Sequence, residues 1–294
     1  MNDFETTYQL IRNGGVGFHE ESRGLIAVWG KEAVQFLDGL ISNDMKTLAE
    51  GEQMFAAFPN AQGRLLAVVR VLKKGDRYLF ETEEATREMV FNNLFRFTFA
   101  GDFYVEDRSR QFRYFELFGA LTDHEVTETS FVNPHSTGIF VSLDQADIYR
   151  ANVLSAGAVE ISDELYEVLR IENGVPKYGV DMDEITIVPE LGMSDLISYK
   201  KGCYIGQEII ARIYFRGHVA KSLTGLRLSG NAVAGTELTT LDGKNAGRIT
   251  SVTFSQKLAQ TVALAFVRYD HLAVGTKLLA GDVDAIVSEL PFVK

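Results

Sequence analysis

The stretch QMFAAFPNAQGRLLAVVRVL, residues 53–72, consists of two apolar runs separated by a short polar segment that contains a glycine. Each run has the length of a β-strand, and the NAQG between them is a hairpin signal. A third run, RYLFET at 77–82, follows the turn KKGD. The pattern therefore predicts three consecutive strands joined by short turns.

Residues with helical spacing flank these strands. GLIAVWG at 24–30 predicts a strand, and KEAVQFLDGLI at 31–41 predicts a helix with one apolar face. That face is formed by Ala33, Phe36, Leu37, Leu40 and Ile41. Residues 83–99 predict a second helix, whose inner stripe is Met89, Val90, Leu94 and Phe95. Strands FYVEDR and FRYFELFG follow, and this order favours α+β layers over a uniform parallel sheet.

SDELYEVLRIENG at 162–174 predicts a helix that Ser162 caps and that Asn173-Gly174 ends before Pro176.

The pattern of the sequence changes after residue 217. From Lys221 onward the runs are short, several of them alternate, and most are separated by turns that contain glycine. Such a pattern is typical of a small barrel or sandwich. We expect two regions, residues 1–217 and residues 218–294.

Composition limits the class of protein. The 294 residues are 46% hydrophobic and 23% charged, which is ordinary for a globular protein. No window has the ~18 consecutive apolar residues of a membrane helix, and the acidic N-terminus is unlike a signal peptide. The single cysteine cannot form an intramolecular disulfide. The sequence thus predicts a cytoplasmic protein that does not associate with membranes.

The net charge is negative. Asp and Glu number 40 and Lys and Arg number 29, which gives −11 at neutral pH. Such a surface repels phosphates, so we expect no direct nucleic-acid binding. A local basic pocket for a small anion remains compatible with this charge. Four basic residues lie close enough in sequence to form one: Lys200, Lys201, Arg212 and Arg216.

The lone cysteine lies in KKGCYIGQE, residues 200–208. QEIIARI at 207–213 predicts a helix, and the preceding glycines permit a turn that brings Cys203 to its amino end. The helix dipole and the two lysines would favour the reactive thiolate there. The alternative is a small buried hydrophobic residue, as free cysteines often are. One cysteine and five scattered histidines lack the ligand spacing of zinc sites, so no metal site is expected.

KKGCYIGQEIIAR resembles the signature K-G-C-Y-x-G-Q-E of the YgfZ-type folate-binding proteins. These are relatives of the aminomethyltransferase (T-protein) of the glycine cleavage system. LRIENGVPKYGVDMD followed by VPEL, within residues 169–191, is similar to the family's central segment. The amino-terminal strands and the final strands also resemble their counterparts, so the resemblance covers essentially the whole chain.

The resemblance implies two interleaved α+β subdomains and a small C-terminal β-barrel, arranged as a three-part ring around an opening that admits tetrahydrofolate or a one-carbon derivative. Glu172 falls on the carboxylate that meets the pterin, a role that suits an acceptor of two hydrogen bonds. Lys200, Lys201 and Arg64 are candidates for the glutamate tail of the folate. Arg170 is instead expected to form structural ion pairs.

Within the signature, Cys203 is the expected functional thiol and Lys201 the cation that stabilises its thiolate. We expect Gly202 and Gly206 to allow the tight turn. Tyr204 would wall the site. Gln207 and Glu208 would hold the loop through hydrogen bonds.

One departure separates two branches of the family. The transferases carry an Asp-Asp pair beside the reacting folate nitrogen, and this chain has Leu66 and Ala67 there. Neither side chain can hold a proton, so aminomethyl transfer would lack its acid–base group. The resemblance thus favours a folate-dependent accessory protein for assembly or repair of iron–sulfur enzymes, including some that modify tRNA. Iron–sulfur assembly proteins or client enzymes would be its partners. The alternatives are an aminomethyltransferase of glycine cleavage and a non-catalytic, folate-gated interaction module.

Overall fold

The computed structural model describes residues 3–119 and 129–293. The chain forms two compact units that alternate along the sequence. Unit 1 comprises Met1–Phe58, Ala67–Tyr166 and Lys200–Gly202, and unit 2 comprises Pro59–Leu66, Glu167–Tyr199 and Cys203–Lys294. The division at residue 217 that the sequence suggested stays a prediction.

The first sheet of unit 1 has the strand order β3-β4-β5-β2-β6. Its strands are β2 (Arg23–Trp29), β3 (Gln53–Pro59), β4 (Leu65–Lys74), β5 (Arg77–Glu83) and β6 (Tyr104–Asp107). The three consecutive strands expected from residues 53–82 are thereby confirmed as neighbours. In the β4–β5 register, Arg70 lies directly opposite Glu81.

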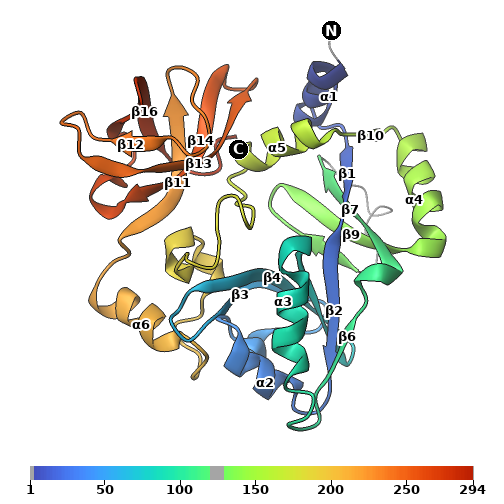
Figure 1. The fold of residues 1–294 in the computed structure, drawn as a ribbon. Coiled ribbons are helices and arrows are strands. Elements are labelled where there is room, and N and C mark those ends of the chain that lie inside the picture. The colour runs from blue at the N-terminus through green and yellow to red at the C-terminus, as the bar shows by residue number, and fades with distance from the viewer. Residues whose placement is uncertain (1–2, 120–128, 294) are drawn as a thin grey trace. The chain divides into compact units, whose positions relative to one another are not determined.

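The second sheet of unit 1 has the order β10-β1-β7-β9-β8. Its strands are β1 (Gly17–Glu21), β7 (Phe112–Phe118), β8 (Ser130–Val132), β9 (Ser136–Ser142) and β10 (Val159–Glu160). Helix α4 (Leu143–Ser155) packs on this sheet through Ala146 and Val153, and α1 (Asp3–Arg12) lies beside β1 (Figure 1).

Two further helices of unit 1 agree with the predicted apolar stripes. Helix α2 (Ala33–Leu40) buries Ala33, Leu37 and Leu40, and α3 (Glu84–Phe95) packs against β2 and β5 through Val90 and Leu94 (Figure 1). The prediction for Phe95 was wrong, since this ring is 41% exposed. Helix α3 ends at Phe95, and its ring contacts Phe91 and Phe99 at the surface in place of the core.

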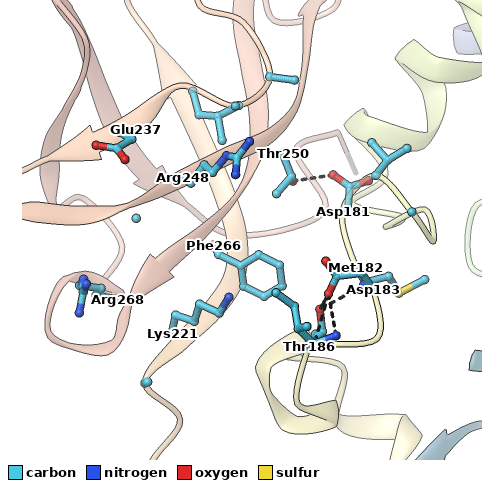
Figure 2. A pocket seen from close by; sticks show the side chains of 18 of the residues that line it. Asp181, Met182, Asp183, Thr186, Lys221, Glu237, Arg248, Thr250, Phe266 and Arg268 are labelled. Carbon is cyan, nitrogen blue, oxygen red and sulfur yellow. Dashed lines mark hydrogen bonds between the residues drawn. The ribbon is translucent and has the colours of Figure 1, made fainter. Parts of the chain in front are cut away.

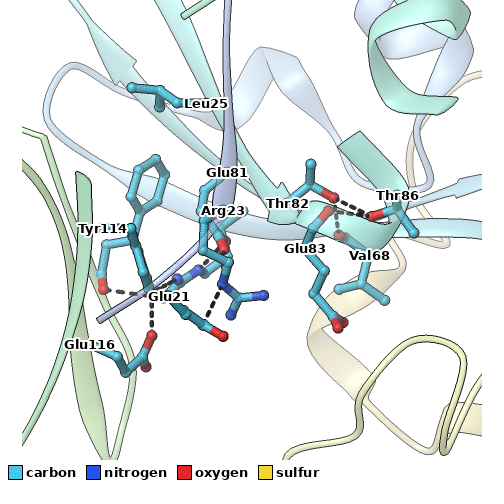
Figure 3. Close-up of polar contacts among 12 residues, drawn as sticks. Glu21, Arg23, Leu25, Val68, Glu81, Thr82, Glu83, Thr86, Tyr114 and Glu116 are labelled. Atoms are coloured by element: carbon cyan, nitrogen blue, oxygen red, sulfur yellow. Dashed lines mark hydrogen bonds and ion pairs between the residues drawn. The ribbon is translucent and has the colours of Figure 1, made fainter. Parts of the chain in front are cut away.

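The interior between the two sheets contains charged as well as apolar residues. A cluster that includes Leu25, Leu72, Phe131 and Phe140 joins the sheets. Beside it lies a polar network that Arg70 forms with five of the residues labelled in Figure 3: Glu21, Arg23, Glu81, Tyr114 and Glu116. The two sheets are therefore held by ion pairs and hydrogen bonds in addition to apolar packing.

Unit 2 contains a closed barrel with the strand order β11-β14-β13-β12-β15-β16. The strands are β11 (Lys221–Leu228), β12 (Glu237–Thr239), β13 (Asn245–Ser255), β14 (Gln260–Arg268), β15 (Lys277–Ala280) and β16 (Val283–Ser288). Small and branched residues such as Ala263, Ala265 and Val267 fill its interior. The expectation of a barrel or sandwich is resolved as a barrel, and the α+β fold class is confirmed.

Two helices complete the described parts of the chain. Helix α5 (Asp163–Glu172) begins beside Ser162, whose hydroxyl accepts a hydrogen bond from the Leu165 N–H at 3.3 Å, as predicted for a cap. Helix α6 (Gln207–Arg216) follows the cysteine loop. Short 3-10 turns span Val188–Leu191 and Ser194–Leu196. Within residues 3–119 and 129–293, no helix is both long and apolar enough to cross a bilayer.

Candidate functional site

The cysteine loop packs against the tip of the β3–β4 hairpin. Gly206 precedes α6 with φ of 80°, and a Cβ atom there would lie 2.3 Å from the carbonyl oxygen of Asn60. Only glycine fits this left-handed conformation and this close approach. The Asn60 side-chain oxygen accepts from the backbone N–H groups of Gln62 and Arg64 at 2.9 and 3.0 Å, which fixes the hairpin tip. NAQG and CYIGQE, far apart in sequence, thus form one substructure of unit 2.

Cys203 lies in the open part of this loop and is exposed. Helix α6 begins four residues later at Gln207, whose N–H donates to the carbonyl oxygen of Tyr204 at 3.1 Å. The thiol is therefore on the surface, in contrast to the buried alternative. Gly202 has no steric requirement for glycine, since an added Cβ would meet nothing within 4 Å.

The remaining motif side chains surround this loop in different ways. Tyr204 is 8% exposed, and burial, with a smaller effect of Tyr199, raises the pKa of its phenol. Gln207 is half-buried and Glu208 is exposed. Both lie in the first turn of α6, where the helix dipole stabilises a carboxylate such as that of Glu208. Arg64 is exposed at the hairpin tip, and its backbone pairs with Ile187.

Lys201 belongs to unit 1, and its side chain is completely buried. Its ammonium donates to the carbonyl oxygens of Asp38, Ile41 and Asn43 at 2.7, 2.9 and 2.7 Å, and its nitrogen lies 3.3 Å from the Asp38 carboxylate. Burial lowers the pKa of Lys201, and Asp38 opposes this shift. These partners hold Lys201 at the end of α2. Lys200, beside it, is exposed, and the roles predicted for both lysines stay predictions.

Glu172 is the last residue of α5 and is 0% exposed. Its carboxylate accepts a hydrogen bond from the Ser255 hydroxyl on β13, and its carbonyl oxygen accepts from the N–H of Phe292 at 2.8 Å. Apolar residues from the same unit, Ile171, Val262 and Phe292 among them, form a buried cluster around this end of the helix. The structure thus gives Glu172 an enclosed position with defined partners.

Arg170, two residues earlier on α5, is the predicted ion-pair former. Its guanidinium contacts Asp181 at 2.9 Å and Glu167 at 2.6 Å, and it donates to the Ser251 hydroxyl at 2.9 Å. Burial by itself would lower the pKa of Arg170, but Glu167 and Asp181 outweigh it and raise that pKa. Arg170 therefore joins α5, the segment after it and the barrel. Leu66 and Ala67, both on β4, are half-buried and buried aliphatic residues.

Comparisons with known proteins agree with this architecture. Residues 221–294 match the family described as the glycine cleavage T-protein C-terminal barrel domain. The crystal structure of the glycine cleavage system aminomethyltransferase T from Bartonella henselae superimposes with a TM-score of 0.87, at 19% identity, over 97% of this chain and 88% of that one. The chain has the T-protein fold.

A curated relative extends the likeness beyond the barrel. "Putative transferase At1g60990, chloroplastic" from Arabidopsis thaliana is 24% identical over 310 aligned residues, which cover 95% of this chain and 72% of the relative. These comparisons do not distinguish a YgfZ-type protein from an aminomethyltransferase.

The barrel of unit 2 also borders a pocket that sequence reasoning missed. It has a volume of about 720 Å³ and is lined by the segment 179–186 and by β11, β12, β13 and β14 (Figure 2). Three basic side chains line it: Lys221, Arg248 and Arg268. These residues are up to 47 positions apart (268 − 221), and only the strand register brings them together. No motif in the sequence could have indicated them.

Proposed function

We propose that this chain is a tetrahydrofolate-binding accessory protein of the cytoplasm that supports assembly or repair of iron–sulfur enzymes, including enzymes that modify tRNA. Cys203 is its functional thiol. The observation that carries this proposal is the exposed Cys203 on a loop whose Gly206 is fixed against Asn60. A surface thiol on a sterically defined loop is suited to reaction with a partner, whereas a core cysteine is not.

The folate part of the proposal rests on the T-protein fold and on Glu172. A buried carboxylate in apolar surroundings is a strong acceptor for the 2-amino-pyrimidinone edge of a pterin. A carboxylate has about four lone-pair positions, so it can accept from more than one donor. Because Glu172 is 0% exposed, the proposal includes a local opening around the end of α5. Exposed Lys200 and Arg64 would meet the glutamate tail of the folate.

The first experiment tests the thiol. Cys203 is the only cysteine, so alkylation of the intact protein reports on one site. Between about pH 6 and 9, labelling should be at least as fast as in an unstructured peptide of residues 200–208. Slower labelling than in the peptide at every pH would show an inert thiol and remove Cys203 from the proposal.

The same residue is tested in cells. A strain carrying Cys203→Ala, and a matched strain carrying Cys203→Ser, should both lose activity of iron–sulfur enzymes, since neither side chain supplies a thiolate. Wild-type activities in both strains would favour the folate-gated interaction module.

The folate site is tested by calorimetry with tetrahydrofolate. Loss of a charged hydrogen-bond partner costs ~1.5–3 kcal/mol, so Glu172→Gln should weaken binding roughly 10- to 150-fold. Ser255→Ala is the matched control, because it removes a partner of the carboxylate and keeps the carboxylate itself. Unchanged affinity in a folded Glu172→Gln protein, or an equal loss in Ser255→Ala, would exclude Glu172 as the pterin ligand.

The second candidate is aminomethyl transfer. The fold likeness to the Bartonella henselae aminomethyltransferase favours it, and the aliphatic Leu66 and Ala67 count against it because they cannot carry a proton. Purified protein given tetrahydrofolate and aminomethylated lipoyl carrier should form no methylenetetrahydrofolate above background. Steady turnover would establish the transferase in place of the accessory protein.

A further inference from the structure

Three cations of the barrel lie on one face of adjacent strands in the unit 2 pocket. Lys221 on β11 is directly opposite Arg268 on β14, and Arg248 on β13 is directly opposite Phe266 on β14. Opposed residues of an antiparallel pair share a face, and so do residues two apart on one strand. Lys221, Arg248 and Arg268 therefore lie on the face of the sheet that carries Phe266, and all three line the pocket (Figure 2).

Within the described residues, none of these three cations forms an ion pair, although Lys221 has a longer-range electrostatic interaction with the Glu190 carboxylate. Among the residues that the structure describes, none of their charged nitrogens lies within 4.0 Å of a carboxylate oxygen. Lys221 places its ammonium 4.4 Å from the centroid of Phe266, and Arg268 donates to the side-chain oxygen of Asn245 at 2.9 Å. In a chain with 40 acidic and 29 basic residues, cations without ion pairs are unexpected.

The acidic side chains on the facing wall are already engaged. Asp181 accepts from the hydroxyls of Thr250 and Ser251 at 2.5 and 2.6 Å and pairs with Arg170 (Figure 2). Asp183 accepts from the hydroxyl and N–H of Thr186 at 2.9 and 3.1 Å. Their charges are thus committed to holding the segment 179–186. They do not neutralise the basic wall.

We propose that this pocket binds a small molecule that carries two or more oxyanion groups, either an organic polyphosphate or a polycarboxylate. Like charges directly opposite one another on a sheet are destabilising, and a bound anion would remove that cost. Guanidinium groups match phosphate and carboxylate oxygens in a bidentate manner. A volume of about 720 Å³ lies in the range of small-molecule sites, ≈ 300–1,000 Å³.

Glu237 refines the chemistry of this ligand. It is exposed, lines the same pocket and faces Arg248 in the β12–β13 register, yet it forms no ion pair with it among the described residues. Its carboxylate would repel a ligand that is anionic throughout and would accept an N–H or O–H from one that also carries donors. The ligand is thus an anion with a polar donor group. This proposal does not rest on folate binding or on the thiol.

Calorimetry of the full chain with pyrophosphate, and separately with a tri-γ-glutamate peptide, tests the site. We expect saturable binding of at least one probe at one site per chain, weakened by added salt. The double variant Arg248→Gln/Arg268→Gln should lose at least about tenfold in affinity, as expected when charged hydrogen bonds are removed. Binding of pyrophosphate alone assigns phosphate ligands, and binding of the peptide alone assigns polycarboxylates.

Lys257→Gln/Lys277→Gln is the matched control, because it removes two positive charges from the same barrel outside the pocket lining. Its affinity should stay within about threefold of the wild type, since exposed charges at a distance are screened. Unfolding temperatures of both variants establish that they fold. Failure of both probes to bind at millimolar concentration, or an equal loss in the control variant, would overturn the proposal.

Discussion

A cluster of basic side chains in unit 1 and the basic side chains of the unit 2 pocket differ in their partners. In unit 1, Arg70 is 4% exposed, and its guanidinium contacts Glu81 at 2.6 Å, the Tyr114 hydroxyl at 3.0 Å and the Phe131 carbonyl at 3.2 Å. Arg23 pairs with Glu21 at 3.0 Å and with Glu81 at 3.1 Å (Figure 3). In unit 2, the pocket cations have no such carboxylate partners within the described chain.

The difference follows from solvent. A buried charge is tolerated only with well-placed partners, because an unpaired one costs several kcal/mol. At the exposed Arg248 and Arg268, water provides the solvation that carboxylates provide in the network. A cation can therefore remain without a carboxylate partner, and available to a ligand, only where water solvates it. The network of unit 1 stabilises the fold, whereas the pocket of unit 2 is adapted to exchange.

The largest expected effect comes from replacing one arginine in each region. Arg70→Met leaves Glu81 buried with one partner fewer and should lower the free energy of unfolding by ~3–5 kcal/mol. Arg248→Met, the matched change in the pocket, should stay within about 0.5 kcal/mol of the wild type. Urea unfolding measures both. Equal destabilisation by the two substitutions would contradict the claim that Arg70 stabilises the fold and Arg248 does not.

An anion should act on one region only. At about 100 Kd, pyrophosphate or the tri-γ-glutamate peptide, whichever binds, should stabilise the wild type by about 2.7 kcal/mol through mass action. Arg248→Gln/Arg268→Gln should show little of this gain, and Arg70→Met should show all of it. Thermal unfolding with and without the anion measures the three proteins. A full gain in the pocket variant would place the anion elsewhere.

Acid should act on the other region. Burial alone would raise the pKa of Glu81, but Arg70 and Arg23 outweigh it and lower that pKa below 4.5. The unfolded state then binds the proton more tightly, so the contribution of Glu81 is present above about pH 4.5 and is lost as pH falls through the lowered pKa. Arg70→Met/Glu81→Met should lack this part of the acid sensitivity. Urea midpoints measured across this pH range provide the test, and identical slopes for both proteins would contradict the assignment.

The smallest effect concerns the cost of leaving the pocket cations unpaired. Arg268→Gln removes the like charge opposite Lys221 and should leave stability unchanged or raise it by no more than about 0.5 kcal/mol. Lys277→Gln on β15 serves as the control for a lone exposed charge. Urea unfolding at low salt measures both. A loss above about 1 kcal/mol would mean that Arg268 has a structural role through Asn245.

Local pattern predicted much of the fold. The strands around NAQG, the buried face of α2 and the barrel texture after Lys221 are properties of short segments, so period and turn chemistry suffice to identify them. Phe95 was misplaced because helical spacing cannot tell that α3 ends at that residue. The burial of Arg70 could not be predicted either, because within RLLAVVRVL it is a single charged residue that interrupts an apolar run. Its partner Glu81 becomes visible only in the sheet register.

The candidate site was predictable to a lesser degree. The resemblance directed attention to Cys203 and Glu172, and the structure adds their surroundings, namely the contact of Gly206 with Asn60 and the hydrogen bond from Ser255. The buried partners of Lys201 had no local signal, because they lie about 160 residues away in sequence. Long-range contacts of this kind depend on how the elements pack, which spacing does not encode.

The pairing of Arg70 with Glu81 across β4 and β5 also guards the alignment of the two strands during folding. Side chains alternate between the faces of a strand, so a slip of β4 by one residue would turn Arg70 away from the network and bring a neighbouring aliphatic side chain, Val69 or Val71, to face Glu81. The second sheet could then close over this region only by burying Glu81 without that partner. Misaligned chains would stay in an open, hydrated form until the strands realign. The ion pair therefore favours burial of the core only in the native register.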